Sequence, residues 1–363
     1  MNKLEKDFNL PKNIKASISS VIANILLAFI TYRLLINFQG LELVGIWSIL
    51  VAASSLVNIG NLGMGVAVIR YVSQLNLLEE KFTARLFIDT GIIVNFIWHG
   101  SLTLITYFII KFFLIQLVPA EFYIEALAAL PFLMFSNFMS SMTATLIASL
   151  QSIHKGFIGF NVSILGAVIE ILFAFILIPQ IGLLGFALAQ AIRYSISLFI
   201  CINYINSYLN YKFFLPTNFS IPFFKKMIGY SLKVQAGGIL NSLFEPLTKL
   251  TLSQYGDVKA QGIFELAYKT VSLSRNIIVA GLLASIPTLT NLFNSSISEA
   301  KEFYKKAQRK LFFYSTIVML FIALLSPLVS IVWMGNLDYE YILLVNIFVA
   351  GYWVNTLAAN AYN

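Results

Sequence analysis

A small set of charged side chains lies inside long apolar stretches of this sequence. The basic ones are Arg193, Lys233, Lys269 and Arg275. In a membrane span each such charge costs at least about 2.5 kcal/mol on insertion scales, so it is expected to face protein or water. Arginine matches phosphate well because its planar fork of donors binds two oxygens at once. The sequence therefore predicts that Arg275, Lys233, Arg193 and Lys269 line a site for an anionic headgroup.

Two of these cations could instead be neutralised within the protein. Arg193 could pair with Glu170 across neighbouring spans. Lys269 follows Glu265 by one helical turn, a spacing at which opposite charges meet on a helix surface. Both interpretations stay open at the level of the sequence.

Carboxylates in the same stretches are candidates for ion coupling. Glu245 precedes Pro246, where a proline frees a backbone carbonyl and could break the helix beside the carboxylate. Such a carboxylate could take up a proton or help bind Na⁺, whereas a plain pair with Lys249, one turn on, is the alternative. Glu170, close to the middle of its stretch, is a second candidate.

Histidine and cysteine provide little further chemistry. His99 could titrate near neutral pH, although a neutral buried histidine bonded to a backbone carbonyl is the expected state. His154 is the other of the two histidines, and Cys201 is the single cysteine. This set supports neither a metal centre nor a Ser/His/Asp arrangement, and no phosphate-binding Walker sequence is present. We therefore expect no enzyme, no metal and no cofactor beyond a coupling H⁺ or Na⁺.

The stretches themselves define an all-α polytopic membrane protein. The chain is 59% hydrophobic and only 11% charged, far outside the range of soluble domains. A hydrocarbon core of about 30 Å needs roughly 20 helical residues. Span length and charged or Pro/Gly flanks predict about ten transmembrane helices: Ser17–Asn37, Val44–Val66, Leu86–Ile110, Tyr123–Leu150, Ile158–Ile178, Leu183–Ile202, Met227–Leu250, Gly262–Ser285, Leu311–Val332 and Tyr341–Asn363.

Lys and Arg are distributed unevenly between the two sides of these spans. With the N-terminus in the cytoplasm, sixteen fall on the cytoplasmic side and four on the other. Cytoplasmic loops carry such an excess, so we predict a cytoplasmic N-terminus and long cytoplasmic loops at Asn203–Lys226 and Asn291–Lys310. The net charge of +8 then reflects topology and affinity for anionic membrane lipids, and nucleic acid is not an expected partner.

A weak internal repeat divides the chain. Gly45-Ile46-Trp47 opens the second span and Gly262-Ile263-Phe264 opens the eighth, 217 residues later and six spans on. An even number of spans between copies predicts two parallel repeats related by an axis along the membrane normal. The predicted domains are a six-helix bundle over residues 1–205, a cytoplasmic linker over 206–226 and a second bundle over 227–363 with four helices, which we expect to be incomplete.

The same residues resemble a known family. FQGLELVGIWSIL (Phe38 to Leu50) and NIGNLGMGVAVIRYVSQ (Asn58 to Gln74) resemble the first two spans of Wzx-type polysaccharide flippases of the multidrug/oligosaccharidyl-lipid/polysaccharide (MOP) transporter superfamily. SLKVQAGGILNSLFEPLTKLTLSQYG, GIFELAYK and IPTLTNL, between Tyr230 and Asn291, resemble the opening of the second half of those proteins. The resemblance implies a carrier of O-antigen or capsule building blocks linked to undecaprenyl pyrophosphate.

We therefore predict a flippase that moves lipid-linked oligosaccharide across the bacterial cytoplasmic (inner) membrane by alternating access. Membrane lipids and other polysaccharide assembly proteins are candidate partners. Two alternatives remain at this level, a multidrug/cation antiporter of the same superfamily and a membrane enzyme of polysaccharide assembly. A cavity for cationic drugs should favour acidic residues, and a polymerase would usually have a large outer loop with histidine.

Overall fold

The computed structural model is helical throughout the part of the chain that it describes. The described residues are 10–59, 62–75, 77, 79–209, 216, 218–283 and 297–362, and this part contains no strand. Seven of its helices are long and apolar enough to cross a membrane. These findings confirm an all-α, multi-pass membrane protein, whereas the count of about ten spans stays a prediction.

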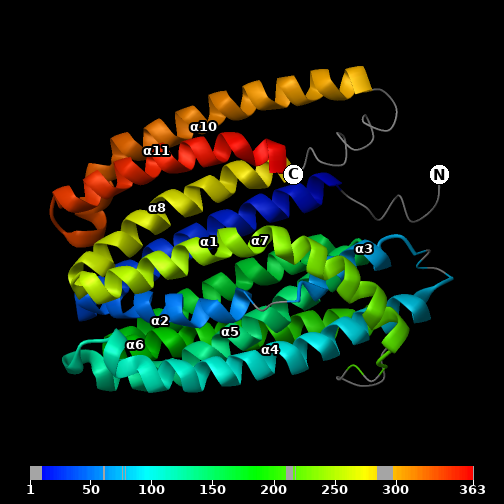
Figure 1. Ribbon diagram of the computed structural model, residues 1–363, viewed down its shortest axis with the longest axis horizontal. Helices are drawn as coiled ribbons and strands as arrows, with labels where there is room; N and C mark the ends of the chain where they lie inside the picture. Colours follow the sequence, from blue (N-terminus) through cyan, green and yellow to red (C-terminus); the bar gives the residue numbers. More distant parts are fainter. Residues whose placement is uncertain are drawn as a thin grey trace.

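The helices run back and forth along the long axis of the molecule (Figure 1). Their bounds are α1 (Leu10–Gln39), α2 (Leu41–Ile59), α3 (Met64–Val72), α4 (Lys81–Leu117), a 3₁₀ turn η1 (Ala120–Phe122), α5 (Tyr123–Ser152), α6 (Gly156–Leu209), α7 (Ile221–Tyr255), α8 (Val258–Leu283), α10 (Ile297–Met334) and α11 (Tyr339–Tyr362). Ser285, the IPTLTNL segment and Asn363, all named in the sequence predictions, lie outside the described residues.

Helix α6 consists of two antiparallel arms. Its 54 residues are interrupted by non-helical backbone at Ile181 and Gly182, where Gly182 has φ 53°. Glu170 on one arm contacts Arg193 on the other, and the Cα of Gly185 lies against the backbone of Leu177. Contacts of this kind require the chain to reverse at the kink, in agreement with the predicted fifth and sixth spans.

Two further features differ from the sequence predictions. The second span is divided, since α2 ends at Ile59 and α3 begins at Met64. Helix α7 is continuous through Pro246, so this proline does not cause the break beside Glu245 that the sequence allowed. A proline in a helix removes one backbone hydrogen bond, and here the surrounding helix tolerates that loss.

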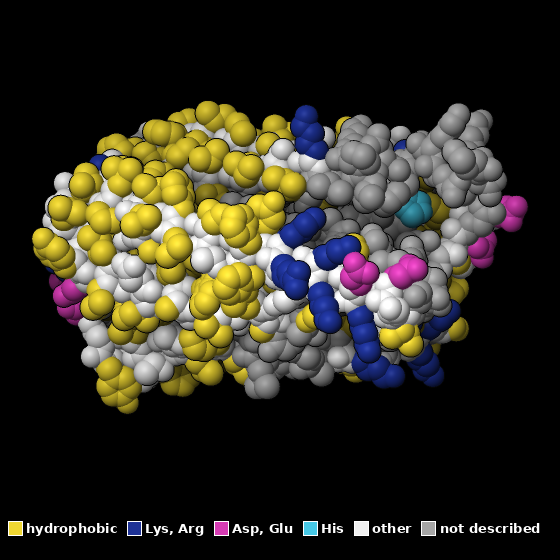
Figure 2. Space-filling model, turned by 90° about the horizontal axis from the view of Figure 1, so that it is seen from above, with side chains coloured by type: hydrophobic (Ala, Val, Ile, Leu, Met, Phe, Trp, Pro, Cys, Tyr) yellow, Lys and Arg dark blue, Asp and Glu magenta, His cyan; other side chains and the backbone are white. Residues whose placement is uncertain are grey.

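The two ends of the bundle differ in their connections. At what we call the short-turn end, α1 joins α2 through Gly40 alone, α7 joins α8 through Gly256 and Asp257, and α10 joins α11 within four residues. The opposite end, which we call the loop end, is on the right of Figure 1, where α3 lies and α4 and α10 begin. In the view of Figure 2, Lys and Arg gather toward the loop end, and hydrophobic side chains cover the short-turn half.

The buried core also divides along this axis. A larger cluster at the short-turn end joins α1, α2, α4, α5 and α6 to α8, α10 and α11, with Trp47 stacked on Phe186 at 4.5 Å between ring centroids. A second cluster toward the loop end joins α3, α4, α5 and α6, and the only described buried residue that α7 adds is Met227. Helix α6 ends and α7 begins inside the predicted 206–226 linker, and the domain division itself stays a prediction.

Candidate functional site

Helices α2 and α8 meet at the short-turn end through two glycines. A Cβ on Gly45 would lie 2.0 Å from the carbonyl oxygen of Val258, and a Cβ on Gly262 would lie 2.6 Å from that of Leu41. Only glycine permits backbones to approach this closely. These are the glycines of the two repeat motifs, which explains locally why both motifs contain one.

A buried network of charges adjoins this contact. We call the glycine contact and the charge network together the α2–α8 seam. Glu265 on α8 is fully buried and accepts hydrogen bonds from Tyr32 on α1 (2.6 Å) and Ser48 on α2 (2.9 Å). Lys249 on α7, also fully buried, lies 2.6 Å from the second carboxylate oxygen of Glu265. Gln261 donates to Ser48 at 3.0 Å. One carboxylate thus links four helices from both parts of the chain.

Glu245 and Lys269 form the more accessible side of the same network. Glu245 accepts from Lys249 at 2.5 Å and from the hydroxyl of Tyr268 at 2.8 Å. Lys269 lies 3.7 Å from Glu265 and 4.0 Å from Glu245. The pairs Glu245–Lys249 and Lys269–Glu265, expected as alternatives to a functional role, are therefore both present, in one network of two carboxylates and two amines.

Arg193 and Glu170 form a separate pair inside the first half of the chain. Arg193 Nη1 donates to Glu170 at 2.8 Å, and Nη2 donates to Asn24 on α1 at 2.6 Å. Both charged residues are less than a tenth exposed. The expected pairing is present, and it ties α1 to the two arms of α6.

Arg275 and Lys233 have a different environment. Arg275 is partly buried on α8, and its Nε has no hydrogen-bond partner among the described residues. Its guanidinium carbon lies 6.0 Å from the ring of Tyr352 on α11. Lys233 is exposed on α7, and the described residues give neither cation a carboxylate within 4 Å. Among the described residues, the four predicted cations thus divide into two that have carboxylate partners, Arg193 and Lys269, and two that have none, Arg275 and Lys233.

Sequence reasoning missed several members of the α2–α8 seam. Tyr32, Ser48 and Tyr268 carry no signal of their own, because hydroxyl side chains are common at membrane interfaces and in helices. Lys249 was considered only as a partner of Glu245. The position of Glu265 in a motif shared by both halves was the one available clue, since Ser48 lies 217 residues before it, the spacing of the repeat.

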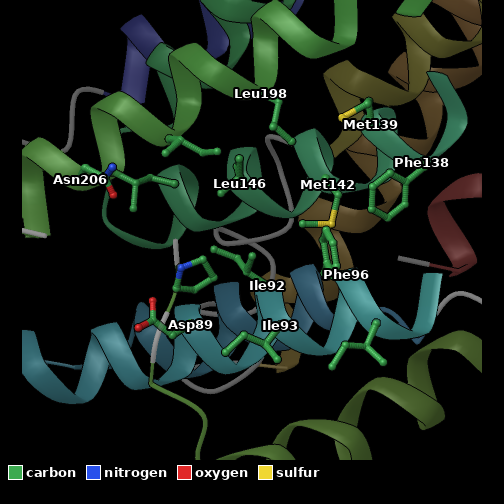
Figure 3. A pocket seen from close by; sticks show the side chains of 14 residues that line it. Asp89, Ile92, Ile93, Phe96, Phe138, Met139, Met142, Leu146, Leu198 and Asn206 are labelled. Carbon is green, nitrogen blue, oxygen red and sulfur yellow. The ribbon is translucent and has the colours of Figure 1, made fainter. Parts of the chain in front are cut away.

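One hollow between the helices of the first half is mainly apolar. A cavity of about 540 Å³ lies between α4, α5 and α6, lined by Ile92, Phe96, Met142 and Leu198, with Asp89 at one end (Figure 3). Asp89 accepts from the backbone and side-chain nitrogens of Asn218. A cavity walled mainly by hydrocarbon and ending in a carboxylate does not suit an anionic headgroup. The role of Arg275 and Lys233 at such a headgroup stays a prediction.

The arrangement matches known transporters. An inward-facing multidrug resistance MATE family transporter of the MOP superfamily superimposes with a TM-score of 0.75 at 16% identity, covering 93% of this chain and 80% of that one. A mutant of the Vibrio cholerae MATE transporter VcmN gives a TM-score of 0.69 at 14% identity, covering 98% of this chain and 84% of that one. A MOP superfamily transporter from Pyrococcus furiosus gives a TM-score of 0.66 at 14% identity, covering 99% of this chain and 85% of that one. That transporter is described as having a binding pocket of reversed polarity. The fold is therefore that of MOP superfamily transporters.

The family follows from the sequence itself. Residues 10–293 match the model of the family described as "Polysaccharide biosynthesis protein", and the chain belongs to this family. Among curated proteins, no sequence matches the chain. The protein is a multi-pass membrane transporter and not an enzyme, which confirms the resemblance to Wzx-type flippases and sets aside an enzyme of polysaccharide assembly.

Proposed function

We propose that this transporter flips an oligosaccharide linked to undecaprenyl pyrophosphate across the bacterial cytoplasmic membrane, for the assembly of O-antigen or capsule. The observation that carries the proposal is the availability of Arg275 and Lys233, two cations without carboxylate partners among the described residues. A pyrophosphate offers the oxygens that such cations bind. The family provides the connection to polysaccharide biosynthesis.

The position of Lys233 supports a site on the side of α7 that faces away from α3. Ser231 donates to the carbonyl of Gly63, so this face of α7 packs on the start of α3. Lys233 lies two residues on, which places it on roughly the opposite face of the helix. Arg275 lies on α8, with its guanidinium carbon 6.0 Å from the ring of Tyr352 on α11. The headgroup would occupy this space while the lipid tail stays in the bilayer.

The α2–α8 seam supports transport by alternating access. It closes the short-turn end through backbone contacts and buried charges, whereas the core at the loop end belongs mainly to the first half. With the N-terminus in the cytoplasm, as the basic loops predict, the loop end is cytoplasmic and this conformation opens inward. Headgroup entry would then precede separation of α2 from α8. Glu245 and Glu170 stay candidate coupling sites for H⁺ or Na⁺.

The test uses proteoliposomes that contain lipid-linked oligosaccharide. Translocation is measured as the accessibility of the sugar to an external lectin. Loss of a charged hydrogen bond worth about 1.5–3 kcal/mol should lower headgroup affinity roughly 10- to 100-fold in Arg275→Ala and Lys233→Ala. Lys306→Ala is the control, because Lys306 is exposed and paired with Glu302 at 2.8 Å. Unchanged translocation in both test variants would contradict the proposed site.

A second function, multidrug or cation antiport, is favoured by the likeness to MATE structures. Uptake of a lipophilic cation driven by an imposed gradient measures it in the same vesicles. The available basic residues predict no such uptake, and uptake that is lost in Glu245→Gln would replace the flippase proposal.

A further inference from the structure

Two cations lie against one aromatic ring at the loop end. Arg70 is in the last turn of α3, and its guanidinium carbon lies 6.0 Å from the ring centroid of Tyr71. Lys226 is in the second turn of α7, and its ammonium nitrogen lies 4.9 Å from the same centroid. Both cations are exposed. Two positive charges from different helices are therefore brought together on the surface, although like charges repel.

Aromatic packing fixes the ring between the two cations. Tyr71 is stacked on Phe87 of α4, with centroids 5.5 Å apart and an interplanar angle of 11°. Its hydroxyl donates to the backbone carbonyl of Lys226 at 3.2 Å. Phe87 is buried and contacts Phe223 on α7, with centroids 4.2 Å apart. The packing of α3, α4 and α7 thus determines that Arg70 and Lys226 meet here.

Arg70 also contacts a second ring in a way that leaves its donors accessible. Its guanidinium carbon lies over Tyr230 of α7, 4.2 Å from the ring centroid. A guanidinium over a ring is attracted through its face, whereas its N–H donors point outward along its edges. Those edges match pairs of phosphate oxygens, so the ring positions Arg70 without using the groups that would bind an anion.

Neither cation has a carboxylate within 4 Å in the part of the chain that the structure describes. Arg193, Lys249 and Lys269 differ in this respect, because each of them is paired with a glutamate. A ring attracts a cation but supplies no oxygen to it. Phosphate would supply oxygens to both cations, since arginine binds two of them through its planar fork and lysine adds a point charge.

We propose that Arg70 and Lys226 bind the phosphate group of a membrane lipid at the loop end, and that Tyr71 and Tyr230 position these cations. Basic residues gather toward this end in Figure 2, and such residues at the ends of membrane-spanning helices lie at the depth of lipid headgroups. An anionic phospholipid and the diphosphate of a lipid-linked sugar both carry the required group.

The position of Lys226 on α7 connects the site to the proposed headgroup residues. Lys226 precedes Lys233 by seven residues, or about 10 Å along the helix axis toward the loop end. A lipid diphosphate bound at Arg70 and Lys226 would therefore lie outward of Lys233, where it could bind first. Its assignment to the transported lipid rests on the proposed function, whereas phosphate binding itself does not.

Native mass spectrometry of the full chain in detergent tests the site by counting bound lipids. Phosphatidylglycerol and a lipid-linked oligosaccharide diphosphate are the phosphate probes, and diacylglycerol is the uncharged probe. We expect Arg70→Gln with Lys226→Gln to weaken binding of a phosphate probe at least about tenfold, because charged hydrogen bonds are lost. Lys301→Gln with Lys305→Gln removes the same charge from exposed positions of α10 and should stay within about twofold of wild type.

Equal affinity of the two double variants for both phosphate probes would overturn the proposal. A loss seen with phosphatidylglycerol assigns the site to membrane phospholipid, and a loss confined to the diphosphate probe assigns it to the transported lipid. Failure of the flippase proposal would instead abolish translocation in wild type and leave the result with phosphatidylglycerol unaltered.

Tyr230→Leu separates the position of the cations from their charge. This variant keeps Arg70 and Lys226 but removes the ring under the guanidinium, and we expect roughly two- to fivefold weaker binding of the phosphate probe. An affinity equal to that of wild type would overturn the positioning role of the ring.

Discussion

Two buried charge networks of this transporter perform different tasks. Arg193 and Glu170 form one cation–carboxylate pair, and every group they join, including Asn24, lies on α1 or α6. Glu265 and its partners combine two carboxylates with two amines and connect α7 and α8 to α1 and α2. The first network holds one half together, whereas the second lies between parts that alternating access would separate.

The comparison shows why an embedded charge is not by itself a binding residue. A buried pair costs desolvation free energy and is a weak source of stability, but removing one partner leaves an expensive unpaired charge. The ion pairs of the α2–α8 seam all lie within α7 and α8, and only hydrogen bonds reach α1 and α2. Opening of the seam would leave Glu265 without the donors Tyr32 and Ser48, so the network can favour the closed short-turn end. Within the first half, the same chemistry only fixes α6 against α1.

The largest effect is expected from Lys249→Met, which leaves two carboxylates facing each other with Lys269 as the remaining nearby amine. Breaking a buried pair costs about 3–5 kcal/mol, so thermal unfolding in detergent should occur at a clearly lower temperature. A double variant, Lys249→Met with Glu265→Leu, removes both charges and should recover part of the loss. Equal stability of wild type and Lys249→Met would contradict the buried network.

Arg193→Met should lower the free energy of unfolding by a similar or slightly smaller amount, since only Glu170 is left unpaired. The useful difference is conformational. Spin labels at Phe82→Cys and Lys301→Cys, in a Cys201→Ala background, report the distance across the loop end; Phe82 and Lys301 are exposed, and Cys201 is the single cysteine. We expect Arg193→Met to leave this distance unchanged and Lys249→Met to shorten its average. The same shift in both variants would remove the distinction between the networks.

Gly45→Val tests the backbone contact of the seam. The added carbon would meet a carbonyl oxygen of α8, which cannot move as a side chain can. Overpacking of this kind costs about 1–3 kcal/mol, and here it should push α2 from α8 and shorten the loop-end distance. Gly351→Ala is the matched control, because its Cβ would meet nothing within 4 Å. A Gly45→Val protein with wild-type distance and stability would show that the contact is not tight.

The smallest effect is expected from Glu302→Gln. Glu302 and Lys306 are 2.8 Å apart, but both side chains are 69% exposed. Exposed pairs contribute little because water and salt screen them. We expect no measurable change in unfolding temperature or loop-end distance, and a clear change in either would mean that surface charges also set the conformational balance.

Individual residues show which contacts could be predicted from the sequence. The pairs Arg193–Glu170, Glu245–Lys249 and Lys269–Glu265 were each foreseen, two of them because a spacing of four places opposite charges on one helix face. Their union at the seam was not foreseen, because Lys249 and Glu265 are on different helices. The sequence predicted a backbone partner for His99, whose ring has no hydrogen-bond partner among the described residues. This was missed for the same reason, because a missing partner is a property of the neighbours and not of the residue.

The sequence by itself determined the class of the protein. Apolar stretches of span length and a few embedded charges follow from the lipid solvent, which acts on each segment locally. Only the tertiary structure decided which cations are paired, that α7 continues through Pro246, and that two glycines 217 residues apart bring α2 and α8 into backbone contact. Those outcomes depend on helix packing, and packing joins residues that no local pattern connects.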